Sequence, residues 1–211
     1  MAYGVKEIFY TLQGEGRNAG RAAVFCRFAG CNLWSGRERD RASAICNFCD
    51  TDFVGTGDPD GGRFTTPEEL AVAIEGRWRG GAAARRFVVL TGGEPLLQVD
   101  LALIAALHSL EFEIAIETNG TIVPPEGIDW ISVSPKAGAP LAVERGDELK
   151  LVYPQAGAEP ELFDGLAFDH FLLQPMDGSN LTENTQAAVD FCLSNPRWRL
   201  TLQNHKQLGI R

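Results

Sequence analysis

Short apolar segments alternate with amphipathic segments along most of this chain, and this alternation limits the possible folds more than any other feature. The segment RFVVL at 86–90 is typical of a buried strand, and Thr66-Pro67-Glu68-Glu69 supplies the hydroxyl cap, proline and acids of a helix start. Strands are predicted at 22–28, 86–90, 113–116, 130–133, 148–152, 171–173 and 198–202, and helices at 66–78, 99–110 and 180–193. Because such alternation builds parallel sheets, we predict an α/β fold, an incomplete (βα) barrel of about six parallel strands, with residues 1–211 in one domain.

Four polar loops follow four of these strands directly. They are Thr91–Pro95 (TGGEP), Glu117–Gly120 (ETNG), Ser134–Lys136 (SPK) and Gln174-Pro175. In parallel α/β folds the loops at the carboxyl ends of the strands meet on one face, where the active site lies. The sequence therefore predicts one pocket shared by the four loops.

Charge and hydropathy argue against nucleic-acid and membrane partners. The chain has 19 basic and 28 acidic residues, a formal net charge of −9, whereas binding to nucleic acid depends on a basic surface. Lys6 and Glu7 stand where a signal peptide would need its apolar core. No segment reaches the roughly 20 apolar residues of a membrane span. We expect a cytoplasmic protein.

Three of the five cysteines have the spacing Cys31-x14-Cys46-x2-Cys49 in a polar segment, about 31–62, that follows the first of the predicted parallel strands. A connection of this length in a compact domain is usually functional or mobile. Without an export signal, thiols at short spacing are more often metal ligands or redox groups than disulfides. We therefore predict an inserted loop that binds a metal cluster.

Zinc and an iron–sulfur cluster are the two readings of these thiols. Structural zinc takes four ligands, usually from two CxxC-like pairs, whereas Cys31 stands alone and no histidine is near it in the sequence. Cys26 and Cys192 fall in apolar contexts and are predicted to be core residues. Three thiolates leave one iron of a [4Fe–4S] cluster open to a further ligand. The spacing favours the cluster, and a non-catalytic zinc-binding module remains the alternative.

Two further motifs resemble the radical S-adenosylmethionine superfamily. Phe48, in Cys46-Asn47-Phe48-Cys49, resembles the aromatic residue of that superfamily's CxΦC ending, and Gly92-Gly93-Glu94-Pro95 resembles its GGEP element. The fourteen residues between the first two cysteines depart from the usual spacing of three. The resemblance implies that S-adenosylmethionine chelates the open iron and yields an adenosyl radical that abstracts hydrogen from a substrate.

Within that superfamily, the chain resembles the 7-carboxy-7-deazaguanine synthase family over essentially its whole length. The matching residues are FYTLQGEG at 9–16, Arg27, the enlarged cysteine spacing and Asp50-Thr51. The resemblance implies a carbon–nitrogen lyase of queuosine or deazapurine biosynthesis that converts 6-carboxy-5,6,7,8-tetrahydropterin to 7-carboxy-7-deazaguanine with loss of ammonia. Hydrogen abstraction at pterin C6, ring contraction and return of hydrogen from 5′-deoxyadenosine are the implied steps. A glycyl-radical activating enzyme is the alternative within the superfamily, and it would need neither the glycine-flanked turn nor Thr51.

The resemblance also implies Mg2+, an external reductant such as flavodoxin or ferredoxin, a homodimer, and a set of site residues. The cofactor would contact Phe48, Asp50, Gly92, Gly93, Glu94, Glu117, Asn119, Ser134, Lys136 and Gln174; the pterin would contact Gln13, Glu15, Arg27, Thr91 and His205; the cluster would bind Cys31, Cys46 and Cys49, and Mg2+ would bind Thr51. No catalytic side chain is assigned, because the cofactor radical carries the chemistry. From the residues alone, 13–16 can also be a polar surface turn, Arg27 a salt-bridged residue, Asp50-Thr51 a turn cap, and the segment with His205 a frayed tail.

Overall fold

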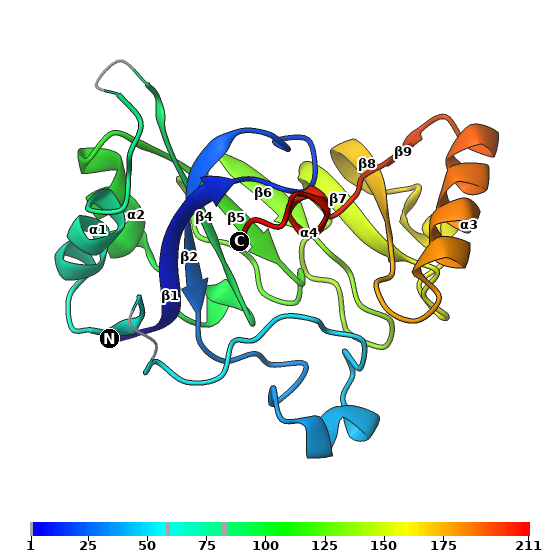
Figure 1. Cartoon of the computed structure of the whole chain (residues 1–211), viewed down its shortest axis with the longest axis horizontal. Helices are drawn as coiled ribbons and strands as arrows, with labels where there is room; N and C mark the ends of the chain where they lie inside the picture. The colour runs from blue at the N-terminus through cyan, green and yellow to red at the C-terminus, as the bar shows by residue number, and fades with distance from the viewer. Residues whose placement is uncertain (1, 58–59, 82–83) are drawn as a thin grey trace.

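One curved sheet forms the frame of the protein. The computed structural model describes residues 2–57, 60–81 and 84–211, and in them nine strands form a single sheet in the order β3-β1-β2-β4-β5-β6-β7-β8-β9 (Figure 1). The strands are β1 (Tyr3–Leu12), β2 (Ala22–Phe28), β3 (Gly62–Phe64), β4 (Arg86–Gly92), β5 (Phe112–Thr118), β6 (Trp130–Val133), β7 (Arg145–Tyr153), β8 (Ala167–Pro175) and β9 (Trp198–Leu200). The helices are α1 (Pro67–Glu75), α2 (Leu101–Ser109), α3 (Leu181–Ser194) and α4 (Asn204–Leu208), with short 3-10 turns η1 (Glu38–Ser43), η2 (Pro95–Leu97) and η3 (Pro160–Phe163).

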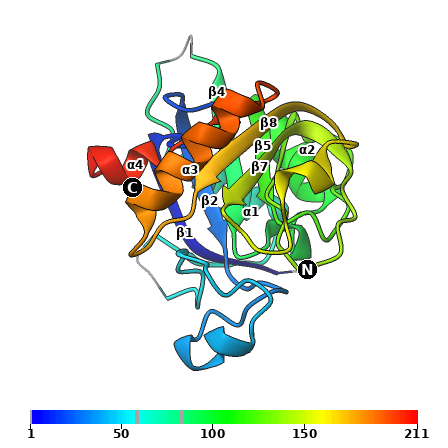
Figure 2. The same ribbon diagram turned by 90° about the vertical axis from the view of Figure 1, so that its right-hand side faces the viewer.

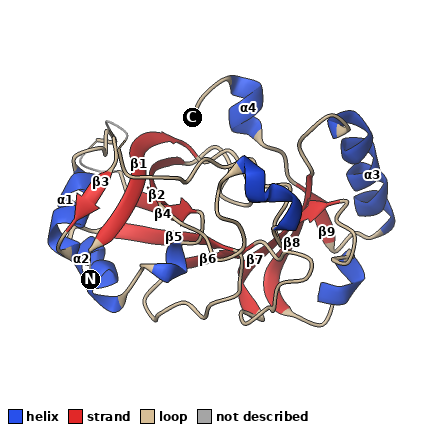
Figure 3. Ribbon diagram, turned by 90° about the horizontal axis from the view of Figure 1, so that it is seen from below, coloured by secondary structure: helices blue, strands red, loops and turns tan. Residues whose placement is uncertain are grey.

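Strand direction confirms the predicted α/β class. Seven neighbouring strands, β2 and β4 to β9, pair in parallel, while β1 pairs antiparallel with both β2 and β3. The sheet curls without closing on itself, which gives the expected incomplete barrel (Figure 3). Within the described ranges, no helix is long and apolar enough to cross a membrane.

Most predicted elements are present, with shifted ends. Thr66 forms a complete capping box with Glu69 at the start of α1, but the helix ends at Glu75 rather than at Trp78. Trp78 instead packs edge-on against Tyr10, with ring centroids 5.3 Å apart. Strands β7 and β8 extend beyond the predicted 148–152 and 171–173, and α4 has no counterpart among the predicted elements. The predicted 31–62 connection contains η1, and its positions 58–59 lie outside the described residues.

Helices cover the outer face of the sheet at two places (Figures 1 and 2). At one end α1 and α2 pack against β1, β2, β4 and β5 around a core that includes Cys26. At the other end α3 covers β7, β8 and β9, with Cys192 half-buried at the margin of the second core. Asp100 caps α2 by accepting from the backbone N–H of Leu103 at 3.0 Å, and it also accepts from the hydroxyl of Tyr3 at 2.8 Å. This carboxylate therefore links the start of the chain to the helix layer.

The inner face of the barrel is layered because side chains alternate along each strand. Phe25, Val89 and Ala115 belong to an inner apolar cluster. Two residues further along the same strands lie Arg27, Thr91 and Glu117, which line a cavity. The carboxyl end of the barrel is therefore polar above an apolar floor.

The α2 interface allows a direct test of the outer core. Leu107 is completely buried, whereas Leu101 on the same helix is 63% exposed. We expect Leu107→Ala to lower the free energy of unfolding by about 2–5 kcal/mol, because the lost contacts leave a cavity. The matched control Leu101→Ala should change it by less than about 0.5 kcal/mol. Denaturant titration followed by circular dichroism measures both, and equal effects would contradict the packing described here.

Candidate functional site

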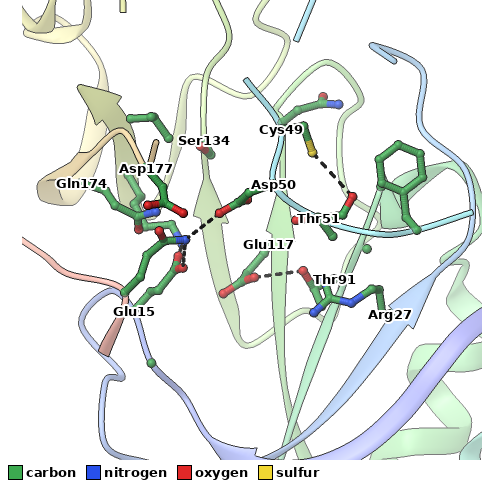
Figure 4. Close-up of a pocket in the computed structure, with 18 of the residues that line it drawn as sticks. Glu15, Arg27, Cys49, Asp50, Thr51, Thr91, Glu117, Ser134, Gln174 and Asp177 are labelled. Atoms are coloured by element: carbon green, nitrogen blue, oxygen red, sulfur yellow. Dashed lines mark hydrogen bonds and ion pairs between the residues drawn. The ribbon is translucent and has the colours of Figure 1, made fainter. Parts of the chain in front are cut away.

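A cavity of about 370 Å³ opens at the carboxyl ends of the parallel strands (Figure 4). Every predicted site residue except Glu94 lines it, including the three clustered cysteines, the turn after β1 and His205 near the C-terminus. Residues from β1, β2, β4, β5, β6, β7 and β8 contribute to its wall. The shared pocket expected from the four post-strand loops is thus present.

The three predicted cluster ligands meet at one side of this cavity. Cys31 follows β2, whereas Cys46 and Cys49 follow η1, and Cys46 is the most buried of the three. A hydrogen bond between the thiols of Cys46 and Cys49 is the main reason that the pKa of Cys49 is lowered to about 6 and that of Cys46 is raised. Burial raises the pKa of Cys31. Of the Cys46 and Cys49 thiols, Cys49 is therefore the one that loses its proton more readily.

The two ends of the fourteen-residue insertion are joined by a hydrogen bond at the second cysteine. The backbone N–H of Cys46 donates to the carbonyl of Leu33 at 3.4 Å, so the ends of the segment between them lie side by side. Arg41 returns from the insertion and donates to the carbonyl oxygens of Asn47 and Cys49, both at 3.0 Å. The insertion therefore leaves Cys31 near the other two thiols and braces the loop that carries them.

The donor set fits a cluster better than a single ion. In the described part of the chain, no group of three His, Cys, Asp or Glu side chains is arranged to hold one metal ion. Structural zinc needs four ligands around one centre, and Cys26 is fully buried in the outer core. The thiolates of a [4Fe–4S] cluster bind different iron atoms, so they need not converge on one point, and three of them leave one iron free.

The glycines after β4 allow the sheet to approach the cysteine loop closely. A Cβ atom on Gly93 would lie 2.1 Å from the carbonyl oxygen of Gly30 and 2.9 Å from Cβ of Cys31. The backbone N–H of Gly93 donates to the carbonyl of Phe28 at 3.3 Å. Any side chain at position 93 would therefore separate the two loops.

Glu94, which the sequence predicts to contact the cofactor, does not itself line the cavity. It is completely buried behind the cavity wall and accepts from the backbone N–H of Asn119 and the hydroxyl of Thr118, both at 2.8 Å, and from the N–H of Leu96 at 3.0 Å. Burial raises the pKa of this carboxyl. In this structure the Glu94 carboxylate therefore fixes the backbone of Asn119, and its contact with the cofactor stays a prediction.

The turn after β1 carries polar groups into the opposite side of the cavity. Gln13 donates to Glu117 at 3.0 Å, and the hydroxyl of Thr91 donates to the other oxygen of Glu117 at 2.9 Å. Burial alone raises the pKa of Glu117, but the charge of Lys150 and these two hydrogen bonds outweigh it, so the pKa is lowered. Glu117, predicted among the cofactor contacts, thus lies with the residues predicted to bind substrate.

Arg27 fits both readings that the sequence left open. It lines the cavity, and its Nε also donates to Glu7 at 2.8 Å. Glu7 is further paired with Arg211, whose guanidinium lies 4.9 Å from the ring centroid of Phe9. The ion pair uses Nε, and within the described part of the chain the two Nη groups of Arg27 make no hydrogen bond, so they are suited to an anionic ligand.

Ser134 and Lys136 lie close to the thiols. Lys136 donates to both the carbonyl and the hydroxyl oxygen of Ser134 at 2.7 Å, and its Nζ lies 6.0 Å from the ring centroid of Phe48. Burial lowers the pKa of Lys136. This places the predicted cofactor contacts from the loop after β6 against the CxxC segment.

Several cavity residues were missed by the sequence analysis. Lys206 in α4 bridges Asp50 and Asp177 at 2.5 and 2.6 Å, and Gln203 donates to Asp50 at 3.2 Å. Lys150 pairs with Glu15, and its position between two leucines in a strand was a signal of the same kind as that of Arg27. The residues that α4 contacts are far from it in the sequence, so no local pattern predicts these contacts.

Two buried polar atoms point to a polar ligand. Among the described residues, neither the hydroxyl of Ser132 nor Oε1 of Gln174 has a hydrogen-bond partner, and both residues line the cavity. Buried polar groups without partners are costly. A ligand with donor groups would satisfy both atoms, which is consistent with the predicted role of Gln174.

Cluster binding can be tested with single cysteine variants. We expect Cys31→Ala, Cys46→Ala and Cys49→Ala each to lose most of the iron and the brown absorbance after anaerobic reconstitution, because two thiolates cannot retain the cluster. Cys192→Ala, which changes a half-buried thiol outside the cavity, is the matched control and should keep both. Iron and sulfide analysis with absorption spectra measures the outcome, and one zinc ion per chain would contradict it.

Comparison with known proteins places this site in a family. Residues 41–149 match the Radical SAM superfamily. The chain is 65% identical to 7-carboxy-7-deazaguanine synthase of Bradyrhizobium diazoefficiens and 64% identical to that of Bordetella pertussis, with each chain covered over 100% of its length. Among solved structures, QueE from Escherichia coli superposes with a TM-score of 0.72 at 29% identity, covering 97% of this chain and 95% of that one. With full-length matches at this identity and the three cysteines gathered at the cavity, the chain belongs to the 7-carboxy-7-deazaguanine synthase family of the Radical SAM superfamily.

Proposed function

We propose that this protein converts 6-carboxy-5,6,7,8-tetrahydropterin to 7-carboxy-7-deazaguanine with loss of ammonia, a step towards queuosine and related deazapurines. One observation carries the proposal: the cysteine loop and the turn with Gln13 and Glu15 face the same cavity. The full-length relatives named 7-carboxy-7-deazaguanine synthase support the same reaction.

A [4Fe–4S] cluster and S-adenosylmethionine belong to this superfamily, and when bound they supply the adenosyl radical that abstracts hydrogen. Cys31, Cys46 and Cys49 would hold the cluster. Phe48, Ser134 and the backbone of the Gly92-Gly93 turn would line the cofactor's place, together with Asp50, Asn119, Lys136 and Gln174. The close approach of Gly93 to Gly30 sets the distance between these two groups of residues.

The opposite wall offers the groups that a carboxypterin requires. Gln13 and Glu15 present amide and carboxylate oxygens to the N–H groups of the pyrimidine ring, and Glu117 lies beside them with Thr91. The guanidinium of Arg27 would pair with the substrate carboxylate. The pterin would then lie between the turn after β1 and the cysteine loop, with C6 on the cofactor side.

The C-terminal segment would help to exclude water from the cavity. Lys206 joins the loop after Cys49 to the loop after β8 through Asp50 and Asp177, and His205 lies 4.0 Å from Glu15. A radical must be shielded from solvent and side reactions, so a wall tied down by ion pairs serves the proposed chemistry.

Magnesium is part of the proposal through Thr51. Its side chain lines the cavity between the cysteine loop and the substrate residues. Magnesium often takes one or two protein ligands and completes its shell with waters and substrate oxygens, so a single hydroxyl together with the pterin carboxylate is sufficient.

Further partners are proposed from the family resemblance. The cluster needs an external one-electron donor such as flavodoxin or ferredoxin, and we propose a homodimer of single-domain chains. The single sheet that runs from β3 to β9 supports one domain for residues 1–211. Free thiols and an oxidisable cluster favour the reducing cytoplasm.

The alternatives fit the cavity less well. A glycyl-radical activating enzyme would need an open route for a partner's peptide, and it gives no reason for Gln13, Thr91 and Glu117 to form a buried polar group. A zinc module would need a fourth ligand beside the three cysteines. Neither accounts for the unpartnered polar atoms of Ser132 and Gln174 in the cavity.

The deciding experiment uses protein reconstituted anaerobically with iron and sulfide, then supplied with S-adenosylmethionine, the carboxypterin, a reductant and Mg2+. We expect mass spectrometry to detect 7-carboxy-7-deazaguanine, with formation dependent on all three cysteines. Cofactor cleavage with an intact pterin would retain the radical class and overturn the substrate. A colourless protein that binds zinc and cleaves nothing would overturn both.

The role of Thr51 predicts a specific loss of metal dependence. In Thr51→Val the stimulation of turnover by Mg2+ should fall by at least about tenfold, because the hydroxyl ligand is removed at nearly constant volume. Cluster content and affinity for S-adenosylmethionine should remain unchanged. Thr56→Val, outside the cavity lining on the same connection, is the matched control and should respond to Mg2+ as the wild type does. An unchanged Mg2+ titration in Thr51→Val would exclude this ligand.

A further inference from the structure

Lys150 is a buried cation beside the proposed substrate site, and it has no role in the proposed binding of cofactor or pterin. It lies in the middle of β7, where Leu149 and Leu151 face the outer core and Lys150 faces the cavity. Its ammonium pairs with the carboxylate of Glu15, and the two side chains are only 8% and 15% exposed. A buried charge of this kind persists only where its partners are arranged around it.

Carboxylates from three elements surround the ammonium. Glu15 comes from the turn after β1, Glu117 from β5 and Glu148 from β7 itself, while Lys136, from the loop after β6, is the other cation that acts on the group. Burial alone lowers the pKa of Lys150, but Glu15 and Glu117 more than offset burial and raise it. The side chain therefore stays protonated and supplies one fixed positive charge to Glu15 and Glu117, both of which line the cavity.

The backbone of the turn is held without Lys150. The N–H of Gly16 donates to the hydroxyl of Thr201 at 2.9 Å, and the N–H of Arg17 donates to Glu148 at 2.8 Å. A Cβ atom on Gly16 would lie 2.5 Å from Oε1 of Glu148, so only glycine allows the turn to pack this closely against the Glu148 side chain. These contacts hold the main chain of the turn, whereas the hydrogen bond from Lys150 goes to the side chain of Glu15.

The remaining acceptor capacity of Glu15 can be counted. Lys150 donates to Oε2, and Gln203 donates to Oε1 at 3.1 Å. Each carboxylate oxygen has two lone-pair sites. One site on each oxygen therefore stays open, and two parallel acceptors side by side match two adjacent N–H groups of a planar amidine-like edge.

We propose that Lys150 is a positioning residue that orients the Glu15 carboxylate so that its two open lone pairs face the N–H edge of the pterin. The inference rests on the proposed function and adds to it the Lys150 ammonium, which holds the substrate-binding carboxylate of Glu15 in place. Without the ammonium, Glu15 and Glu117 lose their shared counter-ion, and repulsion between like charges would turn Glu15 away from the substrate.

The expected kinetic signature follows from where Glu15 would act. It contacts the pyrimidine edge, remote from C6, so it contributes equally to ground-state and transition-state binding. Loss of such uniform binding raises KM and leaves kcat nearly unchanged. A purely structural role would instead lower the amount of folded protein or the cluster content.

The test compares Lys150→Met with Lys150→Arg and with Arg145→Met, an exposed control on the same strand. All are reconstituted holoenzymes assayed with the carboxypterin. We expect KM for the pterin to rise about 30-fold or more in K150M, with kcat within about threefold of wild type and the Kd for S-adenosylmethionine unchanged. K150R should recover most of the KM, and R145M should match wild type. Equal pterin KM in wild type and K150M would overturn the inference.

A double-variant cycle with Glu15→Gln keeps the inference testable if K150M folds poorly. The variant E15Q/K150M removes both charges and leaves no unpaired carboxylate, so it avoids the main cause of misfolding. Because Lys150 is proposed to act through Glu15, the double variant should have the KM of E15Q within about threefold. A further tenfold rise would assign Lys150 another role. Absence of turnover in the wild type would instead reject the proposed function, so the two failures are distinct.

Discussion

The two-residue alternation of side chains along the parallel strands is the constraint on which the rest of the structure depends. It sends Leu90 and Ile116 outward to the helices and turns Thr91 and Glu117 inward to the cavity. Because β2, β4, β5 and β6 are parallel, their register places Arg27, Thr91, Glu117 and Ser132 at one level, and Lys150 in β7 lies one inward position further along. The cavity is therefore a property of the register, and a slip by one residue in any strand would exchange a core residue for a polar one.

Much of this arrangement could be predicted from local patterns. The apolar run 86–90 and the cap at Thr66 correctly placed β4 and the start of α1, and the CxxC segment with the Gly-Gly turn located the site. The ends of strands were harder to predict. Strands β7 and β8 continue through polar residues, which are extended because the two strands pair with each other there. A run of apolar residues marks only the buried part of a strand, so it does not show how far the strand continues beyond the core.

Other features needed the tertiary structure. Glu94 has the sequence context of a cofactor contact, yet its carboxylate joins the loops after β4 and β5, a direction that depends on the position of Asn119. The pairing of Lys150 with Glu15 spans 135 positions, and that of Lys206 with Asp50 spans 156. Ion pairs at such separations leave no periodicity to detect. They also mean that segments distant in the sequence must be in place together before the cavity is complete.

The hydrogen bond between Cys46 and Leu33 has a consequence for how the cysteine spacing should be understood. Measured through space, the path from Cys31 to Cys46 runs only through residues 32 and 33, and the segment between Leu33 and Cys46 is an excursion that leaves and returns at the same point. Its length is therefore not set by the dimensions of the cluster. The excursion contributes Arg41, which donates to the carbonyls of Asn47 and Cys49, and the backbone N–H of Trp34, which hydrogen-bonds the Cys31 thiol. The excursion could therefore be replaced by one of different length, provided that the replacement keeps Trp34 beside Cys31 and returns a donor to those two carbonyl oxygens.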